Sequence, residues 1–280
     1  MNEKTMTEAN LPSASELEAY YAGQKKLAHL EHRRKLFRGI ISIIGGIVGW
    51  WILSHTIMIH VPDPWQTVIG SYAALSKSYY YKSVLFSIYR VFTGFILGCI
   101  LGIPLGLMMG WNKVVRDFTF PTFETLRPMP PVSWIPLAIL MFVKMELSII
   151  FLPFLGTFFV VALNAKLGAE SVDESMFRAA RCLGASPIQV FRHVVLPGAL
   201  PFIFTGLAIG MGMAWITIVA AEMISGTYGI GYMCWQSYNL IRYPVVILAM
   251  ITIGVLGYGS SAAIRMLANK YLAWRQVYTQ

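Results

Sequence analysis

Charged residues are scarce in this sequence. Only 12% of its 280 residues are Asp, Glu, Lys or Arg, whereas a water-soluble domain carries about 25%. Apolar residues account for 56%, mean hydropathy is +0.61, and uncharged runs recur along the chain. Several of these runs reach the length of about 20 residues that a helix needs to cross a bilayer. The sequence therefore predicts an all-α protein with several transmembrane helices.

Motifs that carry enzyme chemistry are also missing. The sequence has no GxxxxGK[ST] phosphate-binding loop, so we do not expect this chain to hydrolyse ATP itself. It has neither an HExxH zinc pattern nor a GxSxG nucleophile elbow, which disfavours an intramembrane enzyme. Its three cysteines, Cys99, Cys182 and Cys234, lie far apart without a CxxC pair. We therefore predict no disulfide framework, no metal site and no cofactor bound by this chain.

The net charge of +9 does not indicate a nucleic-acid partner. The lysines and arginines lie mostly between the apolar runs, where they determine the topology of a membrane protein. Residues 1–38 precede the first apolar run, and from residue 16 to residue 38 they combine a basic face with a ragged apolar stripe. We expect a cytoplasmic extension with an amphipathic elbow helix at the membrane surface, and no cleavable signal peptide. The membrane domain is expected at residues 39–280.

Six apolar segments predict six transmembrane helices. The third segment contains five prolines, which forbid a continuous helix and leave open whether it crosses the membrane or re-enters. With six crossings and a cytoplasmic N-terminus, 16 lysines and arginines lie inside and four outside, whereas a re-entrant third segment gives 11 and nine. The positive-inside rule favours six crossings with both termini in the cytoplasm. The segments are approximately 39–59, 83–110, 118–143, 147–166, 198–222 and 244–266.

The second segment carries a glycine at every fourth position. This spacing places a groove without side chains along one helix face, as in GxxxG contacts between membrane helices. The alternative is that the glycines loosen the helix around Pro104. We predict close packing against another helix, in the same subunit or in a second copy, through Gly94, Gly98, Gly102 and Gly106.

The longest connection on the expected cytoplasmic side is residues 167–197. Its pattern predicts a short helix from Asp173 to Leu183, a stop at Gly184, and a second short helix that begins at Ser186 and Pro187. Two short helices around a glycine form a compact projection, which we call the knob (residues 174–193). Small residues at its tip would let another protein approach closely.

The knob carries a motif with regular spacing. Arg178-Ala179-Ala180, Gly184 and then Val194-Val195-Leu196-Pro197 resemble the EAA loop of ABC-importer permeases, with Arg178 in place of the usual Glu and Val194 in place of Ile. The resemblance implies that this loop couples the permease to an ATPase subunit. The residues assigned to that coupling surface are Glu174, Arg178, Ala179, Ala180, Leu183, Gly184, Ala185, Pro187, Leu196 and Pro197.

Two further stretches resemble one branch of this family, the permeases for nitrate, sulfonates, taurine and bicarbonate. They are residues 126–136, with the sequence LRPMPPVSWIP, and residues 218–223 together with Gly229 and Gly231. The resemblance covers most of the chain after residue 37. It implies a type I (MetI-like) importer fold in a bacterial inner membrane. It also implies a homodimer, two cytoplasmic ATPase subunits that bind ATP and Mg²⁺, and an extracytoplasmic substrate-binding protein.

Ionisable residues inside the expected spans are candidates for the substrate pathway. Each costs about 2.5 to 3.5 kcal/mol at the bilayer centre, so each should face protein or a wet cavity. An arginine there suits an anionic substrate, but Arg90 could instead cap a carbonyl and Arg127 could instead balance Glu124. Glu222 would repel an anion and is expected to pair with a donor in the dimer or in a gate.

The proline-rich break at residues 128–136 is also expected at the pathway. Irregular backbone is tolerated in a membrane only where protein or water surrounds it. Trp134 in this stretch is expected in a gate, with anchoring at the membrane interface as the alternative. The residues assigned to the substrate pathway are Arg90, Arg127, Pro130, Trp134 and Glu222.

The sequence thus predicts the membrane subunit of an ATP-driven importer for a small anion. An ion-coupled secondary transporter is the alternative, but it predicts an internal repeat, and the glycine ladder and the proline break have no counterparts in the later spans. The identity of the anion does not follow from the sequence, because one or two arginines in a cavity suit nitrate, bicarbonate, taurine or alkanesulfonates alike.

Overall fold

The computed structural model describes residues 14–57, 61–225 and 227–272, and the chain divides into two units after Trp65. The first unit contains one helix of 43 residues, α1 (Ala14–Thr56). The expected elbow helix (residues 16–38) and the first apolar segment are therefore one continuous helix, because no proline or helix stop separates them.

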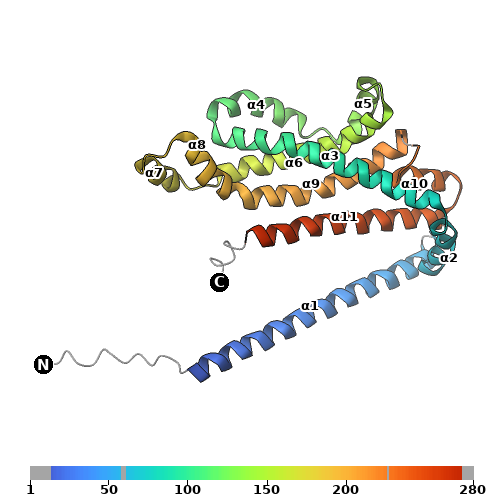
Figure 1. Cartoon of the computed structure of the whole chain (residues 1–280). Coiled ribbons are helices and arrows are strands. Elements are labelled where there is room, and N and C mark those ends of the chain that lie inside the picture. The colour runs from blue at the N-terminus through green and yellow to red at the C-terminus, as the bar shows by residue number, and fades with distance from the viewer. Residues whose placement is uncertain (1–13, 58–60, 226, 273–280) are drawn as a thin grey trace. The chain divides into compact units, whose positions relative to one another are not determined.

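The second unit is entirely helical over its described residues. Its long helices lie lengthwise beside one another, and its short helices lie at their ends or along one side (Figure 1). In chain order the elements are α2 (Pro64–Leu75), α3 (Ser78–Trp111), α4 (Lys113–Leu126), η1 (Pro131–Trp134), α5 (Ile135–Met141), α6 (Met145–Glu170), α7 (Glu174–Cys182), α8 (Pro187–Val190), η2 (Phe191–Val195), α9 (Leu196–Ser225), α10 (Ile230–Asn239) and α11 (Tyr243–Tyr271).

Five stretches of helix in the described part of the chain are long and apolar enough to cross a membrane. They lie at Phe37–Thr56, Ser78–Trp111, Met145–Glu170, Pro187–Ile224 and Tyr243–Tyr271. The third predicted span does not form one long helix. Its prolines divide it into α4, η1 and α5, with extended backbone at Pro130 between them.

The broken segment nevertheless runs the length of α6. Helices α3 and α6 are parallel, because Gly94 in the middle of α3 lies against Pro153 in the first half of α6, and Gly110 at the end of α3 lies against Ala169 at the end of α6. The chain between them must therefore return from one end of this pair to the other. Its contacts follow α6 in reverse order: Arg116 with Glu170, Phe123 with Phe158 and Phe159, Trp134 with Phe151, and Ala138 with Ser148.

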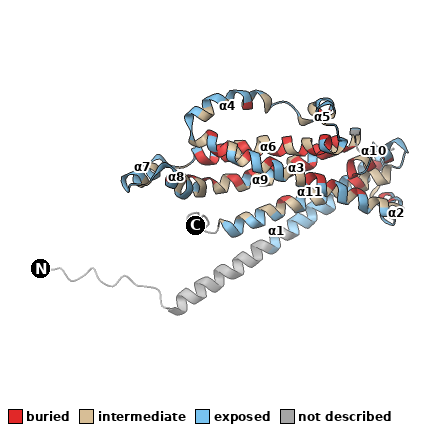
Figure 2. Cartoon of the chain, turned by 45° about the horizontal axis from the view of Figure 1, so that its top comes forward, coloured by how far each residue is buried: buried red, intermediate tan, exposed pale blue. Residues whose placement is uncertain are grey.

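The core of the second unit is the α3–α6–α9 layer, where the buried residues concentrate (Figure 2). The glycine ladder of α3 lies against α6 of the same chain. An added Cβ would lie 2.8 Å from Pro153 Cβ at Gly94, 2.7 Å from Thr157 Cβ at Gly98 and 3.0 Å from the Phe158 carbonyl at Gly102. At Gly106 it would overlap the carbonyl oxygen of Ala162. Close contact between the two helices therefore extends along the second half of α3, from Gly94 to Gly110.

Candidate functional site

A cavity of about 270 Å³ opens where the broken third segment meets α6 and α9. Its wall is mostly apolar, with a few polar side chains, as is typical of small-molecule sites. The lining residues are Arg127, Met129, Pro131 and Trp134 from the broken segment, Leu155, Gly156, Phe159, Val160, Leu163 and Asn164 from α6, and Ile209 and Met213 from α9.

Arg127 is the cation of this cavity. It follows α4 directly, and its Nη2 donates to Glu124 Oε1 at 2.6 Å. Both side chains are more than one-third exposed, so the ion pair is not sealed inside the protein. A guanidinium carries five N–H donors, and among the described residues only one of them is used, by Glu124. Arg127 therefore keeps donors for a further anion while it pairs with Glu124.

Trp134 lines the cavity, whereas Pro130 does not. Trp134 ends η1 and packs edge-on against Phe151, with ring centroids 6.4 Å apart. Its indole N–H donates to none of the described residues. Pro130 starts η1 from an extended conformation, but it is the next residue, Pro131, that lines the cavity.

Arg90 and Glu222 lie elsewhere, as a buried ion pair in a cluster that also includes the partly exposed Glu146. Arg90 is 1% exposed and Glu222 is 0% exposed. Arg90 Nη1 donates to Glu222 Oε1 at 2.9 Å, and its Nε and Nη2 donate to the two oxygens of Glu146 at 2.6 and 2.8 Å. Arg90 also donates to the carbonyl of Tyr228. In this conformation both residues join helices, and neither lines the cavity at Arg127.

Ser87, which the sequence did not single out, completes the cluster together with the stretch around Gly229 and Gly231. Ser87, one turn before Arg90, donates to Glu222 at 2.9 Å and accepts from the Ile230 N–H at 2.8 Å. The Gly231 N–H also donates to Glu222, at 3.0 Å. Gly229 has φ +131, and a Cβ there would overlap the Glu222 carboxylate. This contact explains why a glycine stands at position 229.

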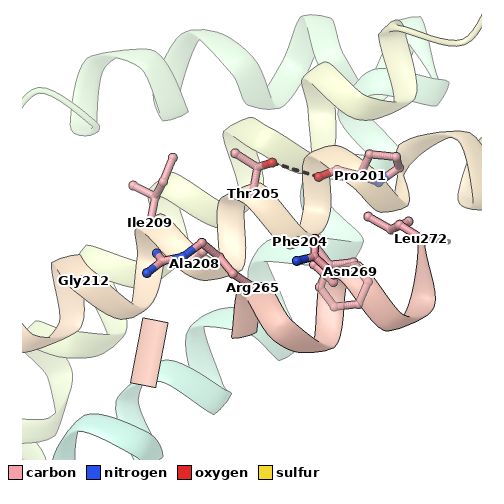
Figure 3. Close-up of a pocket in the computed structure, with 10 residues that line it drawn as sticks. Pro201, Phe204, Thr205, Ala208, Ile209, Gly212, Arg265, Asn269 and Leu272 are labelled. Carbon is pink, nitrogen blue, oxygen red and sulfur yellow. Dashed lines mark hydrogen bonds between the residues drawn. The ribbon is translucent and has the colours of Figure 1, made fainter. Parts of the chain in front are cut away.

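A larger and more open groove of about 770 Å³ lies between α9 and α11. Arg265 and Asn269 reach into it from α11, opposite Thr205, Ala208 and Gly212 of α9 (Figure 3). The Thr205 hydroxyl donates to the Pro201 carbonyl of its own helix at 2.9 Å. Ile209 lines both this groove and the cavity at Arg127, so α9 forms the wall between them.

The knob consists of the short helix α7 and the first turns of a helix that continues through α8 and η2 into α9, so the predicted second short helix is not separate from the span that follows it. Asp173 caps α7, where its carboxylate accepts the Ser175 N–H at 2.8 Å, and this bond lowers the pKa of Asp173 below its ordinary value. Gly184 has φ +80 and forms the bend. Ser186 and Gln189 then form a capping box at α8. The knob is anchored by Phe177 and Phe191, whose rings pack on Trp111 at the end of α3.

The tip of the knob presents apolar side chains to the outside. Leu183 is 87% exposed and Ile188 is 78% exposed, and apart from its chain neighbours no atom of the described residues lies within 4 Å of the position of a Cβ at Gly184. Arg178 pairs with Glu174 one turn earlier, at 3.0 Å, on the exposed face of α7. Leu196 and Pro197 lie at the start of α9, where Leu196 packs on the cluster around Leu107 and Val195.

Comparison with known proteins identifies the class to which this arrangement belongs. Residues 102–273 match the family described as binding-protein-dependent transport system inner membrane component. The chain belongs to this family, a group of membrane subunits of ABC transporters.

Individual relatives are similar over most of their length. The chain is 34% identical to the taurine transport system permease protein TauC of Escherichia coli, over 80% of this chain and 85% of that protein. It is 33% identical to the nitrate import permease protein NrtB of Synechocystis, over 80% of this chain and 84% of that protein. A solved bacterial ABC transporter involved in the import of alginate shares the fold, with a TM-score of 0.57 and 12% identity over 91% of this chain and 99% of that one.

Proposed function

We propose that this chain is the permease subunit of an ATP-driven importer that carries a small anion into a bacterial cell. The observation that carries the proposal is the cavity at Arg127, which offers a cation with unused donors inside a membrane domain of this family. The relatives named for nitrate and for taurine support the same class of substrate, since both are small molecules with an anionic oxygen group.

We further propose six crossings with both termini in the cytoplasm. Five long apolar helices and one broken crossing account for the six, and the parallel packing of α3 and α6 supports the sixth because the chain between them must return along their length. This topology places the knob and the end of α11 on the same side as the N-terminus. The distribution of lysine and arginine favours the cytoplasm for that side.

ATP hydrolysis is assigned to two partner subunits that dock on the knob. Exposed Leu183 and Ile188 offer an apolar contact, and the open space at Gly184 lets a partner approach the backbone. The ring contacts of Phe177 and Phe191 with Trp111 would transmit motion of the knob to α3. ATP and Mg²⁺ are thus expected in the partner subunits, with an extracytoplasmic binding protein that delivers the anion.

A second copy of the chain is expected on the uncovered face of α9. Ile209 and Ile216 are 50% and 66% exposed, and no described atom lies within 4 Å of a Cβ at Gly212 between them. This face lies next to the cavity, because Ile209 lines it. Pairing two such faces would enclose the two cavities between the subunits.

The test is co-purification and transport. The chain, co-expressed with its ATPase subunits, should be isolated with them and should support anion uptake into proteoliposomes only when ATP is supplied on the knob side. A cysteine in place of Ile216 should form a disulfide-linked dimer, whereas one in place of Ile100, exposed on α3, should not. Uptake that needs an ion gradient but no ATP would support the secondary-transporter alternative and contradict the proposal.

A further inference from the structure

The polar side chains of the cavity divide into two kinds. Arg127 and Trp134, both on the wall formed by the broken segment, have N–H donors and no acceptor. Asn164, on α6, is the remaining polar side chain of the lining, and an amide can both donate and accept. An anion held by Arg127 therefore has its donors on one wall and the Asn164 amide on another.

The orientation of the Asn164 amide is fixed by its own helix. Its Nδ2 donates to the Val160 carbonyl at 2.8 Å, and because a carbonyl only accepts, the amide cannot be turned end for end without losing this bond. The Nδ2 side also faces Gly206 of α9, where an added Cβ would lie 3.5 Å from Nδ2 and 2.7 Å from Asn164 Cβ. Gly206 does not line the cavity.

The amide keeps one N–H of Nδ2 and its acceptor, Oδ1, of which only Oδ1 needs a donor from outside the chain. Oδ1 lies on the other side of the amide from Nδ2, and it accepts no hydrogen bond from the described residues. A half-buried acceptor without a donor is unfavourable unless water or a ligand supplies one. A bare anion would not supply one, since its oxygens are also acceptors.

We propose that this cavity selects an anion that also carries a hydrogen-bond donor, and that Asn164 Oδ1 accepts from that donor while Arg127 and Trp134 hold the negative charge. The inference rests on the proposed function, because it specifies the chemistry of the anion in the same cavity. The class includes hydrogen oxyanions such as bicarbonate and ammonium-bearing sulfonates such as taurine. Nitrate and plain alkanesulfonates fall outside it, since neither has a donor.

Two matched pairs of anions isolate the donor. Bicarbonate and nitrate are planar, singly charged and built on three oxygens, and only bicarbonate has an O–H group. Taurine and propane-1-sulfonate have similar length and the same sulfonate, and only taurine has an ammonium group. Bicarbonate and nitrate have the same net charge, whereas taurine is a zwitterion that shares only its sulfonate with propane-1-sulfonate. The contact at Asn164 is therefore reported by the part of each preference that is lost when Asn164 is replaced.

The experiment measures protection of a cysteine in the cavity. Met213→Cys places a thiol on the α9 wall of the complex with the ATPase subunits, after Cys99, Cys182 and Cys234 are replaced by Ala. The binding protein is omitted so that its own selectivity does not enter. The rate of alkylation by N-ethylmaleimide is then followed against the concentration of each anion, at mildly alkaline pH where bicarbonate predominates.

We expect half-protection at about tenfold lower concentration for bicarbonate than for nitrate, and likewise for taurine than for propane-1-sulfonate, as one hydrogen bond predicts. Asn164→Leu should bring both ratios close to one, whereas Asn164→Asp, which keeps an acceptor, should preserve the preference for taurine while weakening nitrate further. Because Asp matches Asn in size, it also controls for a packing defect in the Leu variant.

The outcomes separate this inference from the proposed function. Equal protection by both members of each pair, or a preference that survives in Asn164→Leu, would overturn the role of Asn164 while leaving the cavity as an anion site. Loss of protection by all four anions in Arg127→Gln would support that site. No protection in the parent complex at any concentration tested would overturn both.

Discussion

The glycine ladder of α3 makes a sharp prediction about packing. Gly106→Ala places a Cβ against the Ala162 carbonyl, where a rigid contact of backbone with backbone cannot be relieved by rotating a side chain. Overpacking of this kind costs about 1 to 3 kcal/mol, and the gain in helix propensity from Gly to Ala offsets at most about 1 kcal/mol. Gly106→Leu should cost more, because the helices must then move apart.

The matched control is Gly254→Ala in α11, where no atom lies within 4 Å of the added Cβ. This variant gains propensity without a contact, so it should be as stable as the parent or slightly more stable. Leu97→Ala, on the exposed side of α3, should also have little effect on assembly within the chain.

Thermal unfolding in detergent provides the assay, with a thiol-reactive dye that reports the exposure of Cys99 and Cys234, both of which are partly buried. Gly106→Ala should lower the midpoint of unfolding by several degrees, and Gly254→Ala should not. If both substitutions shift the midpoint equally, or neither does, the contact with α6 does not contribute as the structure indicates.

Three further predictions concern charge and docking. Gly184→Leu should prevent co-purification with the ATPase subunits. Leu183→Asp should do the same without lowering thermal stability, because Leu183 is 87% exposed and its backbone is not strained. Normal co-purification of both variants would contradict the assignment of the knob. Glu222→Gln should destabilise the chain more than Glu146→Gln. Breaking a fully buried ion pair costs about 3 to 5 kcal/mol, whereas the Glu146 side chain is 39% exposed. Equal shifts of the melting temperature in the two variants would count against this ranking. Arg127→Gln should abolish anion uptake while the complex still assembles, and recovery of uptake in the double variant Glu124→Gln with Arg127→Gln would mean that the arginine serves only to balance Glu124.

The features that could be predicted from sequence are those encoded locally. The fourfold spacing of the glycines marks a packing face, the prolines mark the break in the third span, and Asp173, Gly184 and Ser186 mark the ends of the knob helices. Each of these signals depends on residues within a few positions of one another. The structure has the short helix α7 where the knob pattern predicted one, and the second predicted helix begins at Pro187 as expected but continues into α9.

Features that depend on residues distant in sequence were not predictable in the same way. Ser87 and Glu222 are separated by more than a hundred residues, and nothing near Ser87 indicates that it contacts Glu222. Arg90 was associated with the anion because the sequence shows its charge but not the two carboxylates that neutralise it. Asn164 was missed because one amide in an apolar helix has no spacing pattern, and its role depends on α9 and on the broken segment.

The close contact between α3 and α6 has a mechanical consequence. Two helices whose backbones touch over several turns resist sliding and bending relative to each other, so they should move as one rigid unit. Trp111 and the knob lie at one end of this rigid unit, and Arg90 lies toward the other. Arg90 binds both Glu146 at the start of α6 and Glu222 near the end of α9. A displacement of the knob by an ATPase subunit would therefore move this rigid unit as a whole. The resulting force would act toward the opposite face of the membrane, on the Arg90–Glu222 ion pair that connects the unit to α9.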